Sequence, residues 1–368
     1  MTFVCTSCGR CSGSSSIEWR CACGGLFALA KRLPFRPNLI ESAGRTLWRY
    51  RAMLPLLKGA EPPLSLSEGW TPLLSIEDAG RRLWAKLEFL APTGSFKDRG
   101  TSVLISALRA QGIQRVAEDS SGNAGASLAA YAARAGIEAQ VCVPAHASPA
   151  KLHQIEVYGA KLIKVGGPRE RASERAQQLT SEGSYYASHV YNPLILEGLK
   201  TFVYEIWEQL NGKLPHWLIY PTGNGTLLYG SYLGLCDLKE AGVIDRLPRL
   251  IAVQAENCAP LFAPFQGHLP TGPVAKVESA RPTVAEGIAI RKPPRAEQIL
   301  KALRETKGTV VTVSEDEIRE AQQTLAHQGL YVEPTAAVAL AGWRRLKDHI
   351  KPKEQVLLPL TGSGLKAL

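Results

Sequence analysis

The chain contains the stretch Pro92-Thr93-Gly94-Ser95-Phe96-Lys97-Asp98-Arg99-Gly100, a turn that places one lysine between two glycines. Apolar residues follow at helical spacing as far as Gly112, so we predict that Lys97 lies where a loop becomes a helix N-terminus. The positive end of a helix dipole disfavours an ammonium ion, and shielding from water would favour the neutral amine further. A neutral lysine amine is a nucleophile that forms imines with aldehydes. A lone lysine is otherwise a solvated surface group, here beside Asp98.

The motif Ser95-Phe96-Lys97-Asp98-Arg99-Gly100 resembles the cofactor-lysine motif of threonine synthases. These enzymes belong to the tryptophan-synthase-like, fold type II group that uses pyridoxal 5'-phosphate. The resemblance implies that Lys97 binds this cofactor and is the catalytic base. It extends over nearly the whole chain, because three further motifs follow in the family's order.

The second motif runs from Asp119 to Ser127 and joins an expected strand at 116–118 to an alanine-rich helix. Its glycines let the backbone approach a ligand, and the NH groups at a helix N-terminus bind anions such as a substrate carboxylate. The residues alone fit a helix cap equally well. The resemblance implies that Asn123 bonds the phenolic oxygen of the cofactor. We expect the substrate to be bound by Ser120, Ser121, Gly122 and Ala124.

The third motif is a glycine-rich loop between an expected strand at 217–220 and the next helix. Small residues let consecutive backbone NH groups converge, and the helix dipole then supports a phosphate dianion. The loop lacks the glycine spacing of a dinucleotide fingerprint, and glycine turns alone are common in α/β folds. The resemblance implies that it holds the cofactor phosphate, through Gly223, Asn224, Gly225, Thr226 and Leu227.

The fourth motif, Thr361-Gly362-Ser363-Gly364, follows an expected strand at 355–360. As bare sequence it is a C-terminal glycine turn. In threonine synthases the hydroxyl of this threonine bonds the pyridine nitrogen of the cofactor, and the resemblance carries that role to Thr361. A neutral hydroxyl leaves the nitrogen unprotonated, which suits elimination and replacement more than transamination.

Three features depart from the threonine synthase pattern. The family tends to have an arginine two residues after the Asn192-Pro193 pair and an asparagine three residues before it, both facing the substrate phosphate. This chain has Ile195 and His189 there, and isoleucine cannot hold a phosphate. The segment Glu286-Gly287-Ile288 looks more like serine and threonine dehydratases. These departures favour a related reaction as the alternative.

Five of the eight cysteines fall within the first 23 residues. Two short-spaced pairs can close a tetrahedral zinc site and so hold a segment that is too small for its own core. The second pair has one intervening residue instead of two, and Cys11 is a possible substitute ligand. A metal-free vestige of a zinc ribbon fits the sequence equally well. The expected zinc ligands are Cys5, Cys8, Cys21 and Cys23.

Composition favours an enzyme that acts on small molecules. The chain has 368 residues, a net charge of +10 and 21% charged residues, without any block of like charges. We therefore expect an anionic amino-acid substrate and neither nucleic acid nor a membrane as partner. The N-terminus shows no secretory signal, so a cytoplasmic enzyme is expected. Dimers are usual in the family, which implies a homodimer.

The alternation of strands and helices, with glycine turns at the strand ends, predicts an α/β fold with mostly parallel sheets. By resemblance it has two open, twisted sheets with helices on both faces. The expected parts are a cysteine ribbon at 1–30, a large cofactor-binding domain at 31–100 and 205–368, and a smaller mobile domain at 101–204.

The resemblance implies a lyase that converts O-phosphohomoserine and water to L-threonine and phosphate, with Lys97 moving the proton of the α-carbon. The alternative enzyme is a serine or threonine ammonia-lyase, or a β-replacing enzyme on a related amino acid. A third hypothesis is a regulatory protein that kept the fold, lost catalysis and contacts nucleic acid. The intact Lys97 argues against this third hypothesis.

Overall fold

The computed structural model describes residues 1–13, 18–56, 63–147, 149–265 and 281–367. It divides into two compact units, each of which is described by itself. The first unit comprises Met1–Trp70 and Ala91–Thr201, and the second comprises Thr71–Leu90 and Phe202–Leu368. The expected domain boundaries at residues 100 and 204, and the mobility of the smaller domain, stay predictions.

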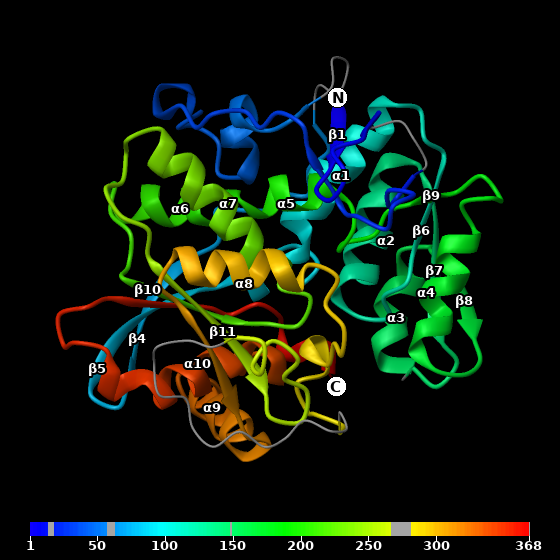
Figure 1. The fold of residues 1–368 in the computed structure, drawn as a ribbon. Helices are drawn as coiled ribbons and strands as arrows, with labels where there is room; N and C mark the ends of the chain where they lie inside the picture. Colours follow the sequence, from blue (N-terminus) through cyan, green and yellow to red (C-terminus); the bar gives the residue numbers. More distant parts are fainter. Residues whose placement is uncertain (14–17, 57–62, 148, 266–280, 368) are drawn as a thin grey trace. The chain divides into compact units, whose positions relative to one another are not determined.

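The first unit contains a four-stranded parallel sheet in the order β8-β7-β6-β9 (Figure 1). Its central strands are β6 and β7, and Val116 of β6 lies between Ala139 of β7 and Tyr185 of β9. The strand bounds are β6 Arg115–Glu118, β7 Glu138–Pro144, β8 Lys161–Val165 and β9 Tyr185–Tyr186. The helices of this unit are α1 Lys97–Ala110, α2 Asn123–Ala135, α3 Pro149–Val157, α4 Arg169–Gln178 and α5 Pro193–Leu199.

The segment between Asn192 and Leu210 forms two helices, divided at Lys200. The first part is α5, and the second part is α6 (Thr201–Gln209). The Thr201 hydroxyl donates a hydrogen bond to the Gly198 carbonyl at 2.7 Å, which offers this carbonyl an alternative to the regular helix pattern. Apolar periodicity continues across the division, so the pattern of residues does not reveal it.

The second unit contains a six-stranded sheet in the order β12-β11-β10-β13-β5-β4. All neighbouring pairs are parallel except β4 and β5, which form an antiparallel edge. The strand bounds are β4 Leu73–Asp78, β5 Arg81–Lys86, β10 Trp217–Pro221, β11 Arg249–Ala255, β12 Thr309–Val313 and β13 Val356–Pro359. Together with the first unit, this confirms the α/β fold with two mostly parallel sheets.

Helices lie on both faces of the second sheet (Figure 1). Alternating residues of β10 and β11, such as Trp217, Ile219 and Ile251, pack into one buried core with α9 and α10. In Figure 1, α7 and α8 lie on the other side of these strands. The helix bounds are α7 Thr226–Glu240, α8 Ala296–Glu305, α9 Glu315–His327 and α10 Pro334–Leu346. Ser314 and Glu317 form a capping box at the start of α9.

The N-terminal segment forms a small antiparallel sheet in the order β2-β1-β3, with β1 Thr2–Cys5, β2 Cys11–Gly13 and β3 Phe27–Leu29. The serine-rich segment between the two cysteine pairs lies partly outside the described residues. Short 3₁₀ segments complete the fold, namely η1 Pro37–Leu39, η2 Leu47–Met53, η3 Glu88–Leu90, η4 Glu286–Ile288, η5 Lys347–His349 and η6 Gly364–Ala367. Within the described ranges, no helix has both the length and the apolar character needed to cross a membrane.

Candidate active site and cysteine cluster

The turn that carries Lys97 is fixed by its neighbour Asp98. The Asp98 carboxylate is fully buried and accepts hydrogen bonds from the Thr93 backbone NH at 2.8 Å and the Thr93 hydroxyl at 2.5 Å. The Ser127 hydroxyl of α2 donates a third bond at 2.7 Å. Gly94 closes the turn with a φ of 79°, which a residue with a Cβ atom rarely adopts. Asp98 therefore ties the lysine turn to the helix of the second motif.

Lys97 is the first residue of α1, as the sequence predicted. Its side chain is half-buried, and Nζ lies 4.5 Å from the centre of the Phe96 ring. The first-turn carboxylate of Asp98 faces the turn rather than solvent, so Asp98 is not the partner of a solvated surface lysine. The importance of Asp98 was missed from the sequence, although its place one residue after Lys97 in a turn of small polar residues was a usable signal.

The second motif forms a tight loop between β6 and α2. A Cβ atom on Gly125 would lie 2.0 Å from the Ser120 carbonyl oxygen, so only glycine allows the loop to fold onto the helix start. The Ser120 hydroxyl accepts a bond from the Gly122 backbone NH at 3.3 Å. Asn123 is the first residue of α2, and Ser121, Gly122 and Ala124 surround it in the chain. This places the predicted carboxylate-binding residues at one helix N-terminus.

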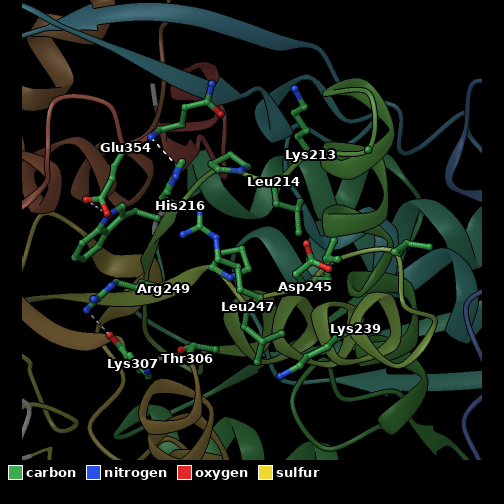
Figure 2. Close-up of a pocket in the computed structure, with 18 of the residues that line it drawn as sticks. Lys213, Leu214, His216, Lys239, Asp245, Leu247, Arg249, Thr306, Lys307 and Glu354 are labelled. Atoms are coloured by element: carbon green, nitrogen blue, oxygen red, sulfur yellow. Dashed lines mark hydrogen bonds between the residues drawn. The ribbon is translucent and has the colours of Figure 1, made fainter.

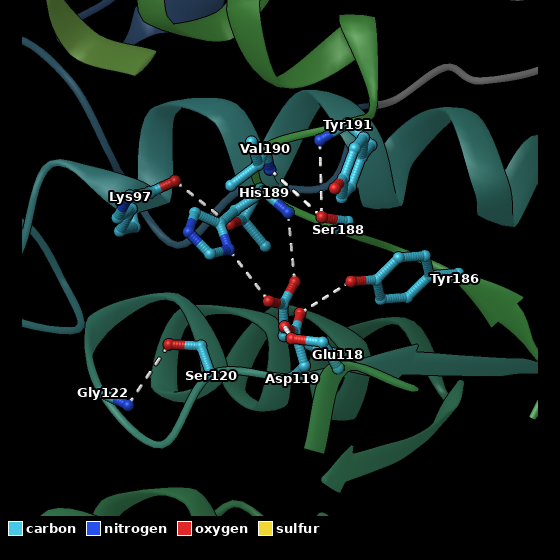
Figure 3. Close-up of polar contacts among 12 residues, drawn as sticks. Lys97, Glu118, Asp119, Ser120, Gly122, Tyr186, Ser188, His189, Val190 and Tyr191 are labelled. Carbon is cyan, nitrogen blue, oxygen red and sulfur yellow. Dashed lines mark hydrogen bonds and ion pairs between the residues drawn. The ribbon is translucent and has the colours of Figure 1, made fainter. Parts of the chain in front are cut away.

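A buried acid and a histidine lie beside this loop (Figure 3). Glu118, at the end of β6, accepts a bond from the His189 backbone NH at 3.1 Å and faces His189 Nδ1 at 2.9 Å. Burial raises the pKa of Glu118 to about 7. Burial and the nearby positive charge of Lys97 hold the pKa of His189 well below its usual range. His189 follows β9, which is a parallel neighbour of β6, so both residues lie at the carboxyl edge of one sheet.

Glu118 was missed from the sequence as a candidate site residue. Asp119, which follows it, accepts bonds from the Tyr186 hydroxyl at 2.8 Å and from the Ser173 hydroxyl. Burial also raises the pKa of Asp119. Two consecutive acids at the end of an apolar strand, directly before a glycine loop, were the available signal.

The glycine-rich loop of the second unit follows the carboxyl end of β10. Gly225 has a φ of 67° and precedes α7, whose N-terminus has no side-chain cap. A Cβ atom on Gly223 would lie 2.8 Å from Ile288 Cα, and one on Gly225 would lie 2.3 Å from Ile299 Cδ1. These glycines let the loop pack closely at a helix start, which is an arrangement that binds phosphate. The dehydratase-like segment Glu286–Ile288 packs against this loop at Gly223.

Thr361 follows β13, the parallel neighbour of β10, so it lies at the same sheet edge as the glycine-rich loop. The Thr361 side chain is buried, and its hydroxyl makes no hydrogen bond with any residue that the structure describes. A buried hydroxyl without a partner is costly, and a ring nitrogen would satisfy it. Gly362 permits the turn because its Cβ atom would lie 2.2 Å from Glu333 Oε1. The second unit therefore fits the phosphate and ring nitrogen of pyridoxal 5'-phosphate.

Ile195 lies inside the packing between α1 and α5. It is buried, and a Cβ atom on Gly100 would lie 2.8 Å from Ile195 Cγ2. The position where the resemblance implied a phosphate-binding arginine thus serves the contact between two helices.

The four predicted cysteines form one group. Their Sγ atoms all lie within 4.8 Å of one another, with Cys5 and Cys23 at 3.5 Å and Cys8 and Cys21 at 3.6 Å. Four thiolates about 2.3 Å from a zinc ion form a tetrahedron with edges of about 3.8 Å. Backbone NH groups of Ser7 and Gly25 also point at Cys5 and Cys23, at 3.4 Å each. Cys11 is exposed and lies outside the group.

A basic pocket lies at the opposite edge of the second sheet (Figure 2). It has a volume of about 830 Å³ and is formed by segments that precede β10, β11, β12 and β13. Its charged lining residues are Lys213, Lys239, Arg246, Arg249, Lys307 and Lys353, with Asp245, Glu305 and Glu354. None of the predicted site residues lines it, because these follow the carboxyl ends of the strands.

Comparison with known proteins agrees with these features. A family model described as pyridoxal-phosphate dependent enzyme matches residues 64–362, and the chain belongs to this family. Within it, the chain is 35% identical to the threonine synthase of Methanocaldococcus jannaschii, over 98% of this chain and 92% of that protein. It is also 35% identical to the threonine synthase of Synechocystis sp., over 91% of this chain and 87% of that protein. The chain is thus a member of the threonine synthase family.

Solved structures share the fold. A threonine deaminase from T.th. superposes with a TM-score of 0.68 and 27% identity, over 84% of this chain and 98% of that chain. Maize serine racemase superposes with a TM-score of 0.67 and 24% identity, over 80% of this chain and 88% of that chain. The second likeness concerns the fold alone.

Proposed function

We propose that this protein is a threonine synthase, which converts O-phosphohomoserine and water to L-threonine and phosphate. The observation that carries the proposal is similarity to threonine synthases over nearly the whole chain, at 35% identity over 98% of its residues. The lysine turn, the glycine-rich loop and the buried Thr361 hydroxyl lie in the family's order and fit its cofactor.

Pyridoxal 5'-phosphate would supply an aldehyde for the Lys97 amine and a ring that withdraws electrons from the substrate. In our proposal the NH groups of residues 223–227 bind its phosphate, and the Thr361 hydroxyl bonds its ring nitrogen. Asn123 bonds its phenolic oxygen, and the start of α2 binds the substrate carboxylate. Lys97, held by the Asp98 turn, takes a proton from the α-carbon and later returns it.

A serine or threonine ammonia-lyase is the second candidate. It is supported by the apolar Ile195 and by the dehydratase-like segment Glu286–Ile288, which backs the glycine-rich loop. The similarity to a threonine deaminase of solved structure also favours it.

Substrate assays separate the two candidates. Purified protein with pyridoxal 5'-phosphate should release phosphate from O-phosphohomoserine and form threonine. Formation of 2-oxobutanoate from threonine, without release of phosphate from O-phosphohomoserine, would support the ammonia-lyase instead. Lys97→Ala is the control for both, because neither reaction proceeds without this amine.

We further propose that Cys5, Cys8, Cys21 and Cys23 bind one structural zinc ion. The support is the near-tetrahedral spacing of their sulfur atoms in a segment with a small core. Metal analysis of the purified protein should find about one equivalent of zinc, as four thiolates fill one structural site. Cys23→Ser should lose the zinc, whereas Cys11→Ser should retain it. A zinc-free wild-type protein would identify a vestigial ribbon.

We also propose that the enzyme works in the cytoplasm as a homodimer that needs neither nucleic acid nor a membrane. The family membership supports this proposal. Light scattering of the purified protein should give twice the mass of one chain, and a monomer would contradict it.

A further inference from the structure

The Glu118 carboxylate holds His189 in position through two contacts. One carboxylate oxygen accepts from the His189 backbone NH at 3.1 Å, and the other faces Nδ1 at 2.9 Å. When Glu118 is ionised it has no hydrogen to donate, so Nδ1 then carries the hydrogen of this pair. The second ring nitrogen, Nε2, is then a hydrogen-bond acceptor.

Lys97 is a charged neighbour of the His189–Glu118 pair. Figure 3 draws Lys97 and the Glu118 carboxylate on opposite sides of the His189 imidazole. The proximity is reflected in the electrostatics, since the charge of Lys97 lowers the pKa of both His189 and Glu118. Lys97, His189 and Glu118 are thus neighbours, with the imidazole in the middle.

Other charged groups also lie near His189. Asp119 and Arg169 also act on the pKa of His189, the first raising it and the second lowering it. Asp119 accepts hydrogen bonds from the hydroxyl groups of Tyr186 and Ser173, and its own hydrogen bonds to Glu118 lower the pKa of that carboxyl group. Burial raises the pKa of Glu118 to about 7, which lets this carboxyl group gain and lose a proton near neutral pH.

We propose that His189 and Glu118 form a proton relay for the amine of Lys97. A hydrogen of the Lys97 ammonium passes to Nε2 of His189, while the hydrogen on Nδ1 passes to Glu118. Lys97 becomes a neutral amine, His189 stays neutral, and Glu118 becomes a carboxylic acid, so the total charge does not change. The reverse transfer restores the ammonium. Both are positioning residues that act through Lys97.

The relay rests on the proposed function only in that Lys97 is the residue that receives the cofactor. It belongs to this chain, because the resemblance implied an asparagine at the position of His189. An asparagine amide neither gains nor loses a proton near neutral pH, so it cannot relay one.

Capture of the cofactor by the Lys97 amine tests the relay without any substrate. Full-length protein freed of cofactor is mixed with pyridoxal 5'-phosphate, and the absorbance change gives the capture rate between pH 6 and 9. The wild-type rate should rise as Glu118 ionises near pH 7. At pH 8, Glu118→Gln and His189→Asn should each lower the rate by about tenfold or more, as loss of acid–base assistance does. Tyr186→Phe, which removes a hydroxyl bonded to Asp119 and leaves the contacts between His189 and Glu118 in place, should keep the wild-type rate.

Chemical rescue separates the relay from a packing role. Added imidazole should accelerate capture by His189→Ala and should fail to do so when Glu118→Gln is also present. Circular dichroism checks the fold of each variant, and the rescue of His189→Ala decides the question where Glu118→Gln does not fold.

Capture by Glu118→Gln at the wild-type rate or faster would overturn the relay, because loss of a nearby carboxylate alone lowers the pKa of an ammonium group. Absence of rescue by imidazole would overturn it as well. A protein that releases no phosphate from O-phosphohomoserine would refute the proposed function and leave the capture result unaffected.

Discussion

Ile195 and Gly100 bring α5 and α1 into direct contact. A Cβ atom on Gly100 would lie 2.8 Å from Ile195 Cγ2 and 2.9 Å from the Ile195 carbonyl oxygen. Gly198 is still closer to its neighbour, since its Cβ atom would lie 2.0 Å from the Arg99 carbonyl oxygen. The backbones of α1, which begins with Lys97, and of α5 therefore lie in close contact.

This contact predicts a graded effect of added methyl groups. Gly198→Ala should destabilise the protein by about 3 kcal/mol or more, because the clash is with backbone that cannot rotate away. Gly100→Ala should cost less, since the Ile195 side chain can yield in part. Gly166→Ala is the matched control, because no atom lies within 4 Å of its added Cβ. Urea unfolding of the three variants measures the order, and equal stabilities would contradict it.

Thr361 predicts opposite effects on stability and on cofactor affinity. Its buried hydroxyl has no partner in the described structure, so Thr361→Val should leave the cofactor-free protein as stable as wild type or about 1 kcal/mol more stable. The same change should weaken the binding of pyridoxal 5'-phosphate by about tenfold, the cost of a lost hydrogen bond in a buried site. Thermal unfolding and equilibrium dialysis measure the two effects. Thr361→Ser should retain affinity, and equal affinity in Thr361→Val would show that the hydroxyl does not contact the cofactor.

Substitutions of Lys86 and Glu205 should have strongly non-additive effects on the free energy of unfolding. Both side chains are fully buried, with Nζ 2.9 Å from Glu205 Oε2. Lys86→Met or Glu205→Leu alone leaves one buried charge unpaired and should cost about 3–5 kcal/mol. The double variant should cost less than either single change, because no charge then remains. Unfolding of all four proteins gives the coupling, and additive losses would mean that water reaches the pair.

The pair of Glu118 and His189 predicts that stability depends on pH more strongly once one of the two residues is replaced. Folding raises the pKa of Glu118 from 4.5 to about 7, so its contribution to stability is present below pH 4.5 and is lost as the pH rises to 7. Folding lowers the pKa of His189 below 6.5, so its contribution is present above 6.5 and is lost as the pH falls. Between pH 5 and 6.5 the two slopes oppose each other.

Removal of one partner should expose the slope of the other. Relative to wild type, Glu118→Gln should gain stability with rising pH between 5 and 6.5, by up to about 1.4 kcal/mol per pH unit. His189→Asn should lose stability over the same range. Urea unfolding at pH 5, 5.5, 6 and 6.5 tests both signs. Two variants with the same slope would show that the two groups do not titrate as a pair.

Much of the fold was predictable because glycines and apolar runs mark the element ends. The starts of α1 at Lys97 and α9 after Ser314 follow from local chain chemistry, which the sequence carries directly. The motif residues could be placed at strand ends for the same reason. The four cysteines were predictable as a group because their spacing is itself the signal.

Contacts between distant segments could not be predicted in this way. The bond from Ser127 to Asp98 and the pairing of Glu118 with His189 join residues from separate motifs, and no local pattern records such pairs. Ile195 reads as an apolar helix residue wherever its side chain points, so its packing on Gly100 needed the structure. The roles assigned to the cofactor-binding residues stay predictions.

The position of β13 determines when the sheet of the second unit can be completed during synthesis. This strand ends at Pro359 yet lies between β10 and β5, and β5 ends at Lys86. At a synthesis rate of about 5–20 residues per second, β13 therefore leaves the ribosome on the order of tens of seconds after β5. Residues 91–201 are complete well before that moment. The six-stranded sheet cannot be completed before β13 is made, because this strand lies between β10 and β5. Folding of the second unit in the nascent chain therefore depends on the segment that carries β13.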